Sequence, residues 1–311
     1  MMINSSKRVA ILGATGHIAN ALIFGLSNIG IYSLFLFARS VDRLNAFLIC
    51  NSINATVDPI ANFIKGDYEV VINCVGIGDP MKLRETKGLI FRLTEEYDDL
   101  ILDYLERHPF TKYINLSSGA VYGTSFDAPV DDSALTLLSM NHINTNNFYG
   151  IAKINSEAKH RSFDNFNIID LRIFSFFSRF MRLEKQYFLS EIINSIKSGK
   201  EFVTDSSDMV RDYVHIRDLA MLVERVIDTA FVNDAFDVYS LKPVLKTELL
   251  HFYKKIYGLK VIVKDNLGSI SVTGNKSFYY SMSRKAQGIG YYPQYTSFDS
   301  IIEETKKILE K

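Results

Sequence analysis

The sequence predicts an α/β protein built on a doubly wound parallel sheet, with a smaller α/β domain at the C-terminal end. Short apolar runs such as Val9–Leu12 alternate with helical patterns through the first half of the chain. A glycine-bearing turn joins the first run to the first helical pattern. No internal repeat or Pro-rich linker interrupts the series. Strands that alternate with helices favour a parallel sheet, because each helix returns the chain to the same edge.

Apolar spacing places the individual elements of the first half. The run at 9–12 is apolar throughout, as expected of a strand buried on both faces. Ile18, Leu22 and Leu26 then recur at helical spacing, and Gly30 ends that helix. Further strands are expected at 33–37, 69–75, 113–116 and 168–174, and further helices at about 88–107 and from about 149.

The regular alternation loosens after about residue 175. Helices are expected near 189–198, at 246–257 and from about 297, with a β-like run at 261–264. We therefore assign residues 1–174 to a first domain, to which 212–240 is expected to return. Residues 175–311 are assigned to a smaller second domain. No flexible linker marks the boundary, so the two parts are expected to pack tightly.

Composition excludes several functional classes. Lys+Arg equals Asp+Glu at 35 each, so charge gives no reason to expect nucleic acid or an anionic membrane as partner. No run approaches the roughly 20 apolar residues of a membrane span. Cys50 and Cys74 fit neither a disulfide framework nor a metal-binding spacing. We therefore expect no metal site and a reducing, cytoplasmic location.

A glycine loop lies between the first strand and the first helix. Gly13 permits the tight turn, Gly16 lets backbone approach a pyrophosphate, and the small Ala19 lets helix pack on strand. The positive helix end and its N–H groups would receive the phosphates. The loop predicts a dinucleotide site, and a glycine turn without a ligand is the alternative. The expected contacts are Gly13, Thr15, Gly16, His17 and Ile18.

The end of the second strand bears on which dinucleotide binds. The run Phe37–Ser40 offers no carboxylate for the adenosine ribose hydroxyls of NAD. Arg39 could instead pair with a 2′-phosphate, which favours NADP(H). Asp42 is close enough to keep NAD(H) open, and Arg39 could simply be solvated. Other candidate cofactor contacts are Asp58 for the adenine edge and Cys74, Val75 and Gly76 at the end of a later strand.

Three polar residues form a candidate catalytic set. Tyr149 and Lys153 are spaced to share one helix face. A phenol, with a pKa of about 10, becomes a useful acid–base near neutral pH only when a neighbouring ammonium stabilises the phenolate. Ser118 lies at the end of a predicted strand, where such sheets hold ligands, and can hydrogen-bond a substrate carbonyl or hydroxyl. A surface pair and a polar turn are the alternatives.

Together these motifs resemble the extended short-chain dehydrogenase/reductases of the NAD-dependent epimerase/dehydratase family, which act on nucleotide sugars. The resemblance covers nearly the whole chain and rests on the glycine loop, the run ending at Gly123, the Tyr149/Lys153 pair, Leu171–Phe174 and Arg211–Ala220. It implies a Rossmann-type dinucleotide-binding domain and a smaller substrate-binding domain. It also implies that Ser118, Tyr149 and Lys153 are catalytic, and that Tyr149 and Lys153 contact the cofactor. The implied substrate contacts are Ser118, Gly119, Ser175 and, at the diphosphate, Arg211. Arg179 is also available for the diphosphate, and a solvated arginine is the alternative there.

Residues beside the catalytic set bear on the reaction. The family's dehydratases carry Asp and Glu directly after the catalytic Ser or Thr, whereas Gly119 and Ala120 cannot move a proton. Its epimerases usually carry Asn at the position of Ser175. Together with Arg39, these departures favour NADPH-dependent reduction of a keto group on a nucleotide-linked sugar, expected to be a deoxy sugar. Tyr149 would donate the proton.

Two other functions stay open at this point. One is a nucleotide-sugar 4-epimerase with tightly bound NAD, and the other is a non-catalytic dinucleotide-sensing protein. The resemblance also implies a role in polysaccharide biosynthesis. It further implies a homodimer, joined in a four-helix interface by the helix at about 88–107 and the helix that carries Tyr149.

Overall fold

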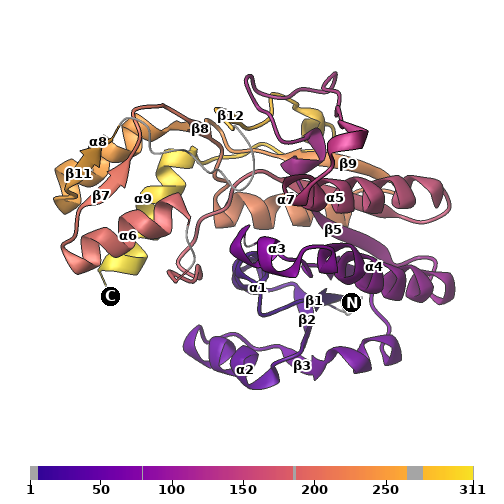
Figure 1. Cartoon of the computed structure of the whole chain (residues 1–311). Coiled ribbons are helices and arrows are strands. Elements are labelled where there is room, and N and C mark those ends of the chain that lie inside the picture. Colours follow the sequence, from indigo (N-terminus) through magenta and orange to yellow (C-terminus); the bar gives the residue numbers. More distant parts are fainter. Residues whose placement is uncertain (1–5, 79, 185–186, 265–275, 311) are drawn as a thin grey trace.

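A seven-stranded parallel sheet forms the centre of the molecule in a computed structural model, which describes residues 6–78, 80–184, 187–264 and 276–310 (Figure 1). The strand order is β3-β2-β1-β4-β5-β6-β9, and every pair is parallel. The order reverses between β1 and β4, the point where Rossmann-type sheets bind ligands. The strands are β1 (Lys7–Leu12), β2 (Tyr32–Ala38), β3 (Thr56–Pro59), β4 (Val70–Asn73), β5 (Lys112–Ser118), β6 (Ile168–Ile173) and β9 (Asp234–Val238).

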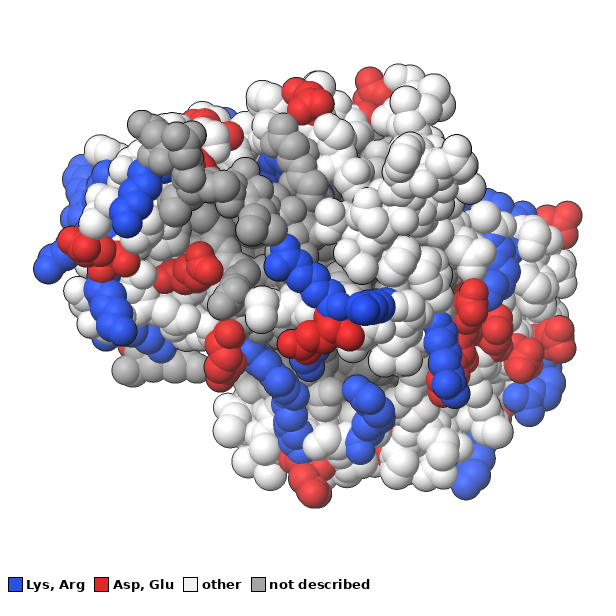
Figure 2. Space-filling model, viewed as in Figure 1, with Lys and Arg blue, Asp and Glu red and all other residues white. Residues whose placement is uncertain are grey.

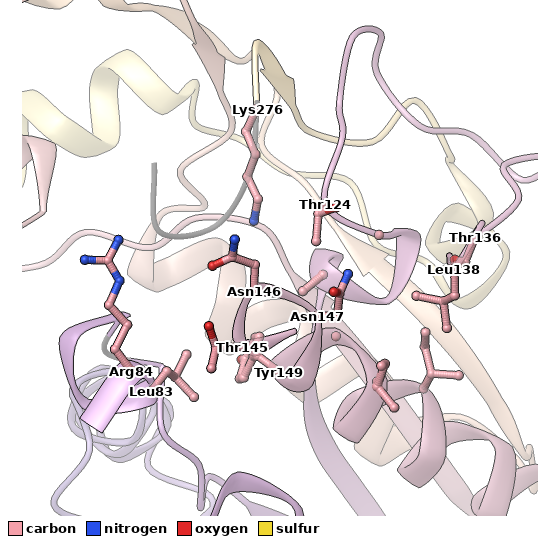
Figure 3. Close-up of a pocket in the computed structure, with 15 residues that line it drawn as sticks. Leu83, Arg84, Thr124, Thr136, Leu138, Thr145, Asn146, Asn147, Tyr149 and Lys276 are labelled. Carbon is pink, nitrogen blue, oxygen red and sulfur yellow. The ribbon is translucent and has the colours of Figure 1, made fainter. Parts of the chain in front are cut away.

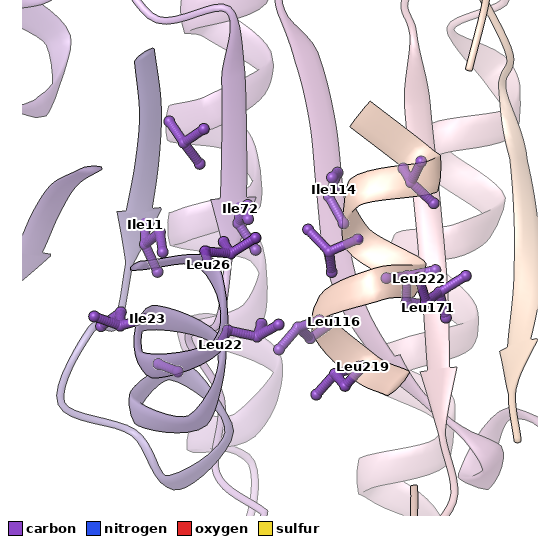
Figure 4. Close-up of a cluster of buried hydrophobic side chains, with 14 of the residues drawn as sticks. Ile11, Leu22, Ile23, Leu26, Ile72, Ile114, Leu116, Leu171, Leu219 and Leu222 are labelled. Atoms are coloured by element: carbon purple, nitrogen blue, oxygen red, sulfur yellow. The ribbon is translucent and has the colours of Figure 1, made fainter. Parts of the chain in front are cut away.

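Helices cover both faces of this sheet. One face packs against α1 (His17–Ile29), α2 (Val41–Cys50) and α7 (Ile216–Asp228). The other packs against α4 (Leu89–Arg107) and α5 (Thr145–Ser162). Figure 4 shows α1 and α7 side by side, with their leucines over the isoleucines of the strands. This double cover explains why the strands are almost wholly apolar.

Gly25 sets the distance between α1 and α7. A Cβ on Gly25 would lie 2.7 Å from the Cβ of Ala220, closer than two carbons can approach. Only the smallest residues therefore allow the two helices to lie together over the sheet. A larger residue at either position would push α7 away from the face that it shares with α1.

A buried ionic cluster fixes α4 and α5 to the other face. His160 of α5 lies 2.9 Å from Asp170 of β6 through Nδ1 and 2.7 Å from Asp98 of α4 through Nε2. All three side chains are almost fully buried. Burial works to lower the pKa of His160, but the two carboxylates outweigh it and raise the pKa to about 9. The cluster therefore holds a protonated imidazole between two carboxylates.

The second part of the chain forms its own core beside the main sheet. Helices α6 and α9 pack together, with α8 beside them, and buried residues such as Phe177, Tyr253 and Ile301 fill the space between. Two small sheets, of order β11-β7 and β10-β8-β12, complete it. The elements are α6 (Phe188–Ser198), β7 (Phe202–Thr204), β8 (Val210–Arg211), β10 (Val244–Leu245), α8 (Lys246–Tyr257), β11 (Val261–Val263), β12 (Phe278–Tyr279) and α9 (Ser297–Leu309).

The predicted fold class is confirmed, with a few differences in its elements. Strands β3 and β9 were not predicted from the sequence, although both lie in the main sheet. The helix expected from about Tyr149 begins earlier, at Thr145, because Asn144 caps it through a reciprocal pair of hydrogen bonds with Asn147. The segment 216–238 supplies α7 and β9 to the main sheet layer.

The solvent-facing side of α4 is strongly charged. Lys159 of α5 lies 2.7 Å from Asp99 of α4, and Phe91 of α4 meets Phe148 of α5, so the two helices pack on each other. The outward residues of α4 are Arg92, Glu95, Glu96, Asp99, Asp103, Glu106 and Arg107. The homodimer through these helices stays a prediction.

None of the described helices combines the length and the apolarity needed to cross a bilayer.

Candidate active site

The glycine loop follows β1 and approaches the end of β4. Gly13 has a φ of +71°, and a Cβ on it would lie 2.9 Å from backbone atoms of Cys74 and Val75. Only glycine fits there. Gly16, the N-cap of α1, supplies no side-chain cap, and the first turn of α1 carries no acidic residue. This helix end therefore suits the pyrophosphate of a dinucleotide.

The other predicted residues of the loop have contacts of their own. Nε2 of His17 lies 2.7 Å from Oγ of Ser178, which follows β6. Ile18 packs against the main core. The Thr15 carbonyl accepts a hydrogen bond of 3.4 Å from Arg43. The loop is thus held from two sides, by the segment after β6 and by α2.

Replacing Gly13 with Ala is expected to weaken dinucleotide binding by at least about tenfold. The added Cβ meets backbone of β4, which cannot move alone, and the left-handed backbone costs about 1–3 kcal/mol of unfolding free energy. Calorimetric titration and urea unfolding measure the two effects. Gly288→Ala is the matched control, because its backbone is ordinary and no atom lies within 4 Å of an added Cβ. Unchanged affinity in G13A would contradict the expected site.

Two arginines lie where the adenosine end of a dinucleotide is expected. Arg39 is exposed directly after β2, and Asp42 is exposed in the first turn of α2. Arg43, four residues after Arg39, was not predicted from the sequence. Its spacing from Arg39 is the sequence signal that could have indicated it. Asp58 on β3 accepts a hydrogen bond of 3.2 Å from Asn62.

The end of β4 faces the glycine loop. The Cys74 amide donates to the Leu12 carbonyl at 3.0 Å, and the Val75 amide donates to the Asn73 side chain at 3.0 Å. Desolvation raises the pKa of the Cys74 thiol to about 12, although the nearby Lys153 ammonium opposes this. Cys74 is therefore a neutral thiol at physiological pH, and Gly76 beyond it is exposed.

Ser118 ends β5 and is almost fully buried. Its Oγ accepts a hydrogen bond of 3.2 Å from the Ala120 amide and lies 3.4 Å from the phenol oxygen of Tyr279. Gly119 beside it lies against the Phe174 ring, since a Cβ at Gly119 would be only 2.4 Å from a ring atom. The hydroxyl is thus fixed at the carboxyl edge of the sheet, where ligands bind.

Helix α5 brings Tyr149 and Lys153 to the turn that follows Ser118. A Cβ on Gly150 would lie 2.6 Å from the Ala120 carbonyl oxygen, so only glycine lets the helix approach this turn. Lys153 is 3% exposed and donates a hydrogen bond of 2.8 Å to the Leu116 carbonyl of β5. The structure therefore brings the end of β5 and the first turns of α5 together.

A buried polar network locks the register of these two elements. Glu157, one turn after Lys153, accepts hydrogen bonds of 2.6 Å from Ser117 and 2.6 Å from Arg172. Arg172 also donates to the phenol oxygen of Tyr122, which in turn donates to Asp237 of β9. The residues that flank the catalytic candidates are thus tied to one another and to the sheet.

Tyr279 of β12 reaches the site from the second part of the chain and was not predicted. It is 6% exposed, and its ring packs against those of Phe126 and Phe174. Burial raises the pKa of Tyr279, so the phenol is neutral and can donate to Ser118. Nothing in the run Phe278–Tyr280 distinguishes this tyrosine from its neighbour.

Replacing Tyr279 with Phe is expected to lower kcat by about fivefold, which corresponds to the loss of one neutral hydrogen bond. The ring and its packing are kept, so the unfolding free energy should change little. Steady-state kinetics with a nucleotide sugar that the protein converts measure the effect. Tyr280→Phe is the neighbouring control, and equal losses in both variants would contradict a role at Ser118.

The remaining predicted substrate contacts have different partners in the structure. Arg211 of β8 donates to the carbonyls of Val210 and Lys276, and no carboxylate of the described residues contacts its guanidinium. Arg179 instead forms an ion pair with Glu304 of α9 at 2.5 Å. Ser175 pairs through its backbone with Tyr213. The guanidinium of Arg179 is therefore already neutralised, whereas that of Arg211 has backbone carbonyls and the Tyr279 ring, but no carboxylate, as partners among the described residues.

A pocket enclosing about 580 Å³, part of it open to solvent, lies at the N-terminal end of α5 (Figure 3). Tyr149 lines it, together with Arg84 of α3 (Pro80–Thr86) and Lys276 before β12. No acidic side chain lines it among the described residues. The other lining residues are Leu83, Ala120, Gly123, Thr124, Thr136, Leu138, Thr145, Asn146, Asn147, Gly150, Ile151 and Ile154.

A family model described as the NAD dependent epimerase/dehydratase family matches residues 9–241, which include the glycine loop, the end of β5, the first turns of α5 and Arg211. The chain belongs to this family. Membership confirms the resemblance found in the motifs and identifies an extended short-chain dehydrogenase/reductase, an enzyme that uses a nicotinamide dinucleotide.

Individual members of the family show how far the similarity extends. UDP-glucose 4-epimerase of Lacticaseibacillus casei is 31% identical over 109 residues, a match that spans 34% of this chain and 32% of that relative. UDP-N-acetylglucosamine 4-epimerase of Methanobrevibacter ruminantium M1, solved with UDP-N-acetylmuramic acid, has a TM-score of 0.79 at 16% identity, covering 98% of this chain and 99% of that one.

A second solved structure gives the same result. UDP-glucuronic acid 4-epimerase of Bacillus cereus, in complex with UDP-glucuronic acid and NAD, has a TM-score of 0.77 at 16% identity. That match covers 97% of this chain and 99% of the other. The two structures show that the fold of the family extends over both parts of this chain.

Proposed function

We propose that this chain is a nucleotide-sugar 4-epimerase that uses a bound nicotinamide dinucleotide. The sequence analysis ranked reduction first and epimerisation second, and the names of the similar proteins support the reverse order. The observation that carries the proposal is the meeting of Ser118 with the α5 turns of Tyr149 and Lys153 beside a pocket. UDP sugars are the first substrates to test.

The roles of the chain's own residues follow from their places. Ser118, with its hydroxyl fixed by the Ala120 amide, would hold the oxygen on the reacting sugar carbon. Tyr149 would take the proton of that oxygen and later return it. Lys153 would favour the phenolate form of Tyr149. The bound dinucleotide would supply the acceptance and return of a hydride.

The pocket supports chemistry without dehydration. The positions after Ser118 are Gly119 and Ala120, and neither side chain can carry a proton. An acid at position 119 would also collide with the Phe174 ring, which lies 2.4 Å from where its Cβ would be. Arg211, without a carboxylate partner, is the proposed contact of the substrate diphosphate.

A second candidate is the NADPH-dependent reduction of a keto sugar. Arg39 and Arg43 lie at the tip of β2 and the start of α2, and both could bind a 2′-phosphate. No carboxylate stands at the strand tip itself, and Asp42 lies within the helix. NAD(H) belongs to the first candidate and NADP(H) to the second, so the identity of the dinucleotide separates them.

The deciding experiment uses the purified protein. The dinucleotide that it releases on denaturation is identified by mass spectrometry, and UDP-, dTDP- and GDP-linked sugars are followed by NMR and by absorbance at the reduced-nicotinamide band. Interconversion of 4-epimers with no net change of reduced cofactor is expected. Stoichiometric loss of NADPH would establish the reductase instead. Dinucleotide binding with no turnover of any sugar would indicate a sensing protein.

A further inference from the structure

Lys276 lies beside the candidate active site, and no acidic residue in the described part of the chain pairs with it. Its ammonium lies 3.9 Å from the centre of the Tyr279 ring and 5.5 Å from that of Phe126. No carboxylate or hydrogen-bond acceptor among the described residues contacts it. Ring faces stabilise a cation only partly, so this ammonium can still bind an anion.

The position of Lys276 places its charge at the sugar end of the site. The Tyr279 ring under the ammonium carries the phenol oxygen that lies 3.4 Å from Ser118. The Tyr279 side chain therefore contacts both groups, the Lys276 ammonium over its ring and the Ser118 hydroxyl beside its phenol oxygen. Lys276 also lines the same pocket as Tyr149, and Figure 3 shows it pointing toward Asn146 at the start of α5.

The electrostatics of this pocket favour an anionic ligand. Arg84 lines it from α3, and Thr145 and Asn146 bring the N-terminal turn of α5, the positive end of that helix, to the same pocket. Figure 2 shows Lys and Arg side chains over the position of α3 on this face. Burial, with the Arg211 charge as a smaller cause, lowers the pKa of Lys276 to about 7. A bound anion would favour the charged form of Lys276 and so raise this pKa again.

We propose that Lys276 forms a subsite for a carboxylate carried by the sugar of the nucleotide-sugar substrate. This inference rests on the proposed function and narrows its substrate class to hexuronic or similarly carboxylated sugars. The diphosphate is the less suitable occupant. Arg211 is available for it: its guanidinium donates to the Lys276 carbonyl and lies 5.8 Å from the centre of the Tyr279 ring, farther than the 3.9 Å of the Lys276 ammonium. The ammonium itself faces the pocket where Tyr149 would meet the sugar.

The test compares Lys276→Met with the wild type by calorimetric titration. The ligands are glucose and glucuronic acid pairs linked to UDP, dTDP or GDP, together with the three free nucleotide diphosphates. K276M should lose roughly tenfold or more in affinity for the carboxylated sugar, because a charged hydrogen bond is lost. Its affinity for the neutral sugar and for the free diphosphate should stay within about threefold. K276R should recover part of the loss.

Lys254→Met, at an exposed position of α8, is the matched control for the removal of one lysine. Equal losses for all ligands in K276M would place Lys276 at the diphosphate and overturn the carboxylate subsite. Unchanged affinity for the carboxylated sugar would overturn it as well. If none of the three free diphosphates binds to the wild type, the proposed function itself fails, and this outcome is distinct from the other two.

Discussion

Replacing Tyr149 with Phe is expected to lower kcat for the sugar by about three orders of magnitude, within the range that a positioned acid–base contributes. The variant keeps the ring and loses only the oxygen that would move the proton. The helix around it is held by the Asn144 cap and by the Gly150 contact with Ala120, so its position should not change. Dinucleotide and nucleotide-sugar affinities should therefore stay within about threefold.

Single-turnover kinetics separate this loss from any effect on binding. The control is Tyr280→Phe, which makes the same change of side chain at a partly buried tyrosine outside the pocket lining. A Y149F variant that keeps more than about a tenth of the wild-type rate would show that another group moves the proton. Lys276, in the same pocket, would then be the first group to examine.

The stability of the fold is expected to depend on the protonation of His160. Its pKa is raised to about 9 in the folded protein, against about 6.5 for a free histidine. A group with a raised pKa contributes its full stability below about pH 6.5 and loses it as the pH rises through about 9. The shift corresponds to about 3 kcal/mol of unfolding free energy.

Urea unfolding at pH 6, 7.5 and 9 measures this contribution when the wild type is compared with His160→Gln. The difference between the two proteins should be largest at pH 6 and should shrink toward pH 9. The comparison is needed because the buried Lys112, whose pKa burial lowers to about 8, shifts stability in the opposite direction above about pH 8. His251→Gln, at an exposed position, should behave as the wild type. A constant difference across the range would refute the expected charge on His160.

Asp98, in the same cluster, makes stability depend on pH in the opposite direction. Burial works to raise the pKa of Asp98, but the hydrogen bond and charge of His160, together with the nearby Lys159 ammonium, outweigh it and leave the pKa lowered. This carboxylate therefore contributes stability above its unfolded pKa of about 3.9, and the contribution is lost as the pH falls further.

The sequence predicted the central strands well because they bury both faces. Strands β1 and β4 contain near-continuous apolar runs, which few other elements produce. β3 is a short edge strand that ends in Pro59, so it carries no such signal. β9 was missed because Asp234 and Asp237 make its pattern look polar. In the structure Asp237 is buried among hydrogen bonds from Tyr122 and Ser281.

The residues of the candidate site likewise form two groups: those that a local sequence pattern indicates and those that only tertiary packing brings to the site. Ser118 and the Tyr149/Lys153 pair could be predicted because their spacing along one strand end and one helix already carries the chemistry. Tyr279 and Lys276 could not, because only the packing of the second part against the sheet brings them to Ser118. The choice among reactions was also beyond local spacing, since it depends on how a sugar lies in the pocket.

The return of the chain to the main sheet has a consequence for folding during synthesis. β6 pairs with β9, and α7 covers the same face as α1, yet α7 and β9 both follow residues 174–215, the first stretch of the chain that leaves the main sheet. At ordinary elongation rates, on the order of ten seconds separates the emergence of β6 from that of β9. During that interval the nascent chain presents an open strand edge and an uncovered apolar helix face. Both are surfaces that aggregate or recruit chaperones.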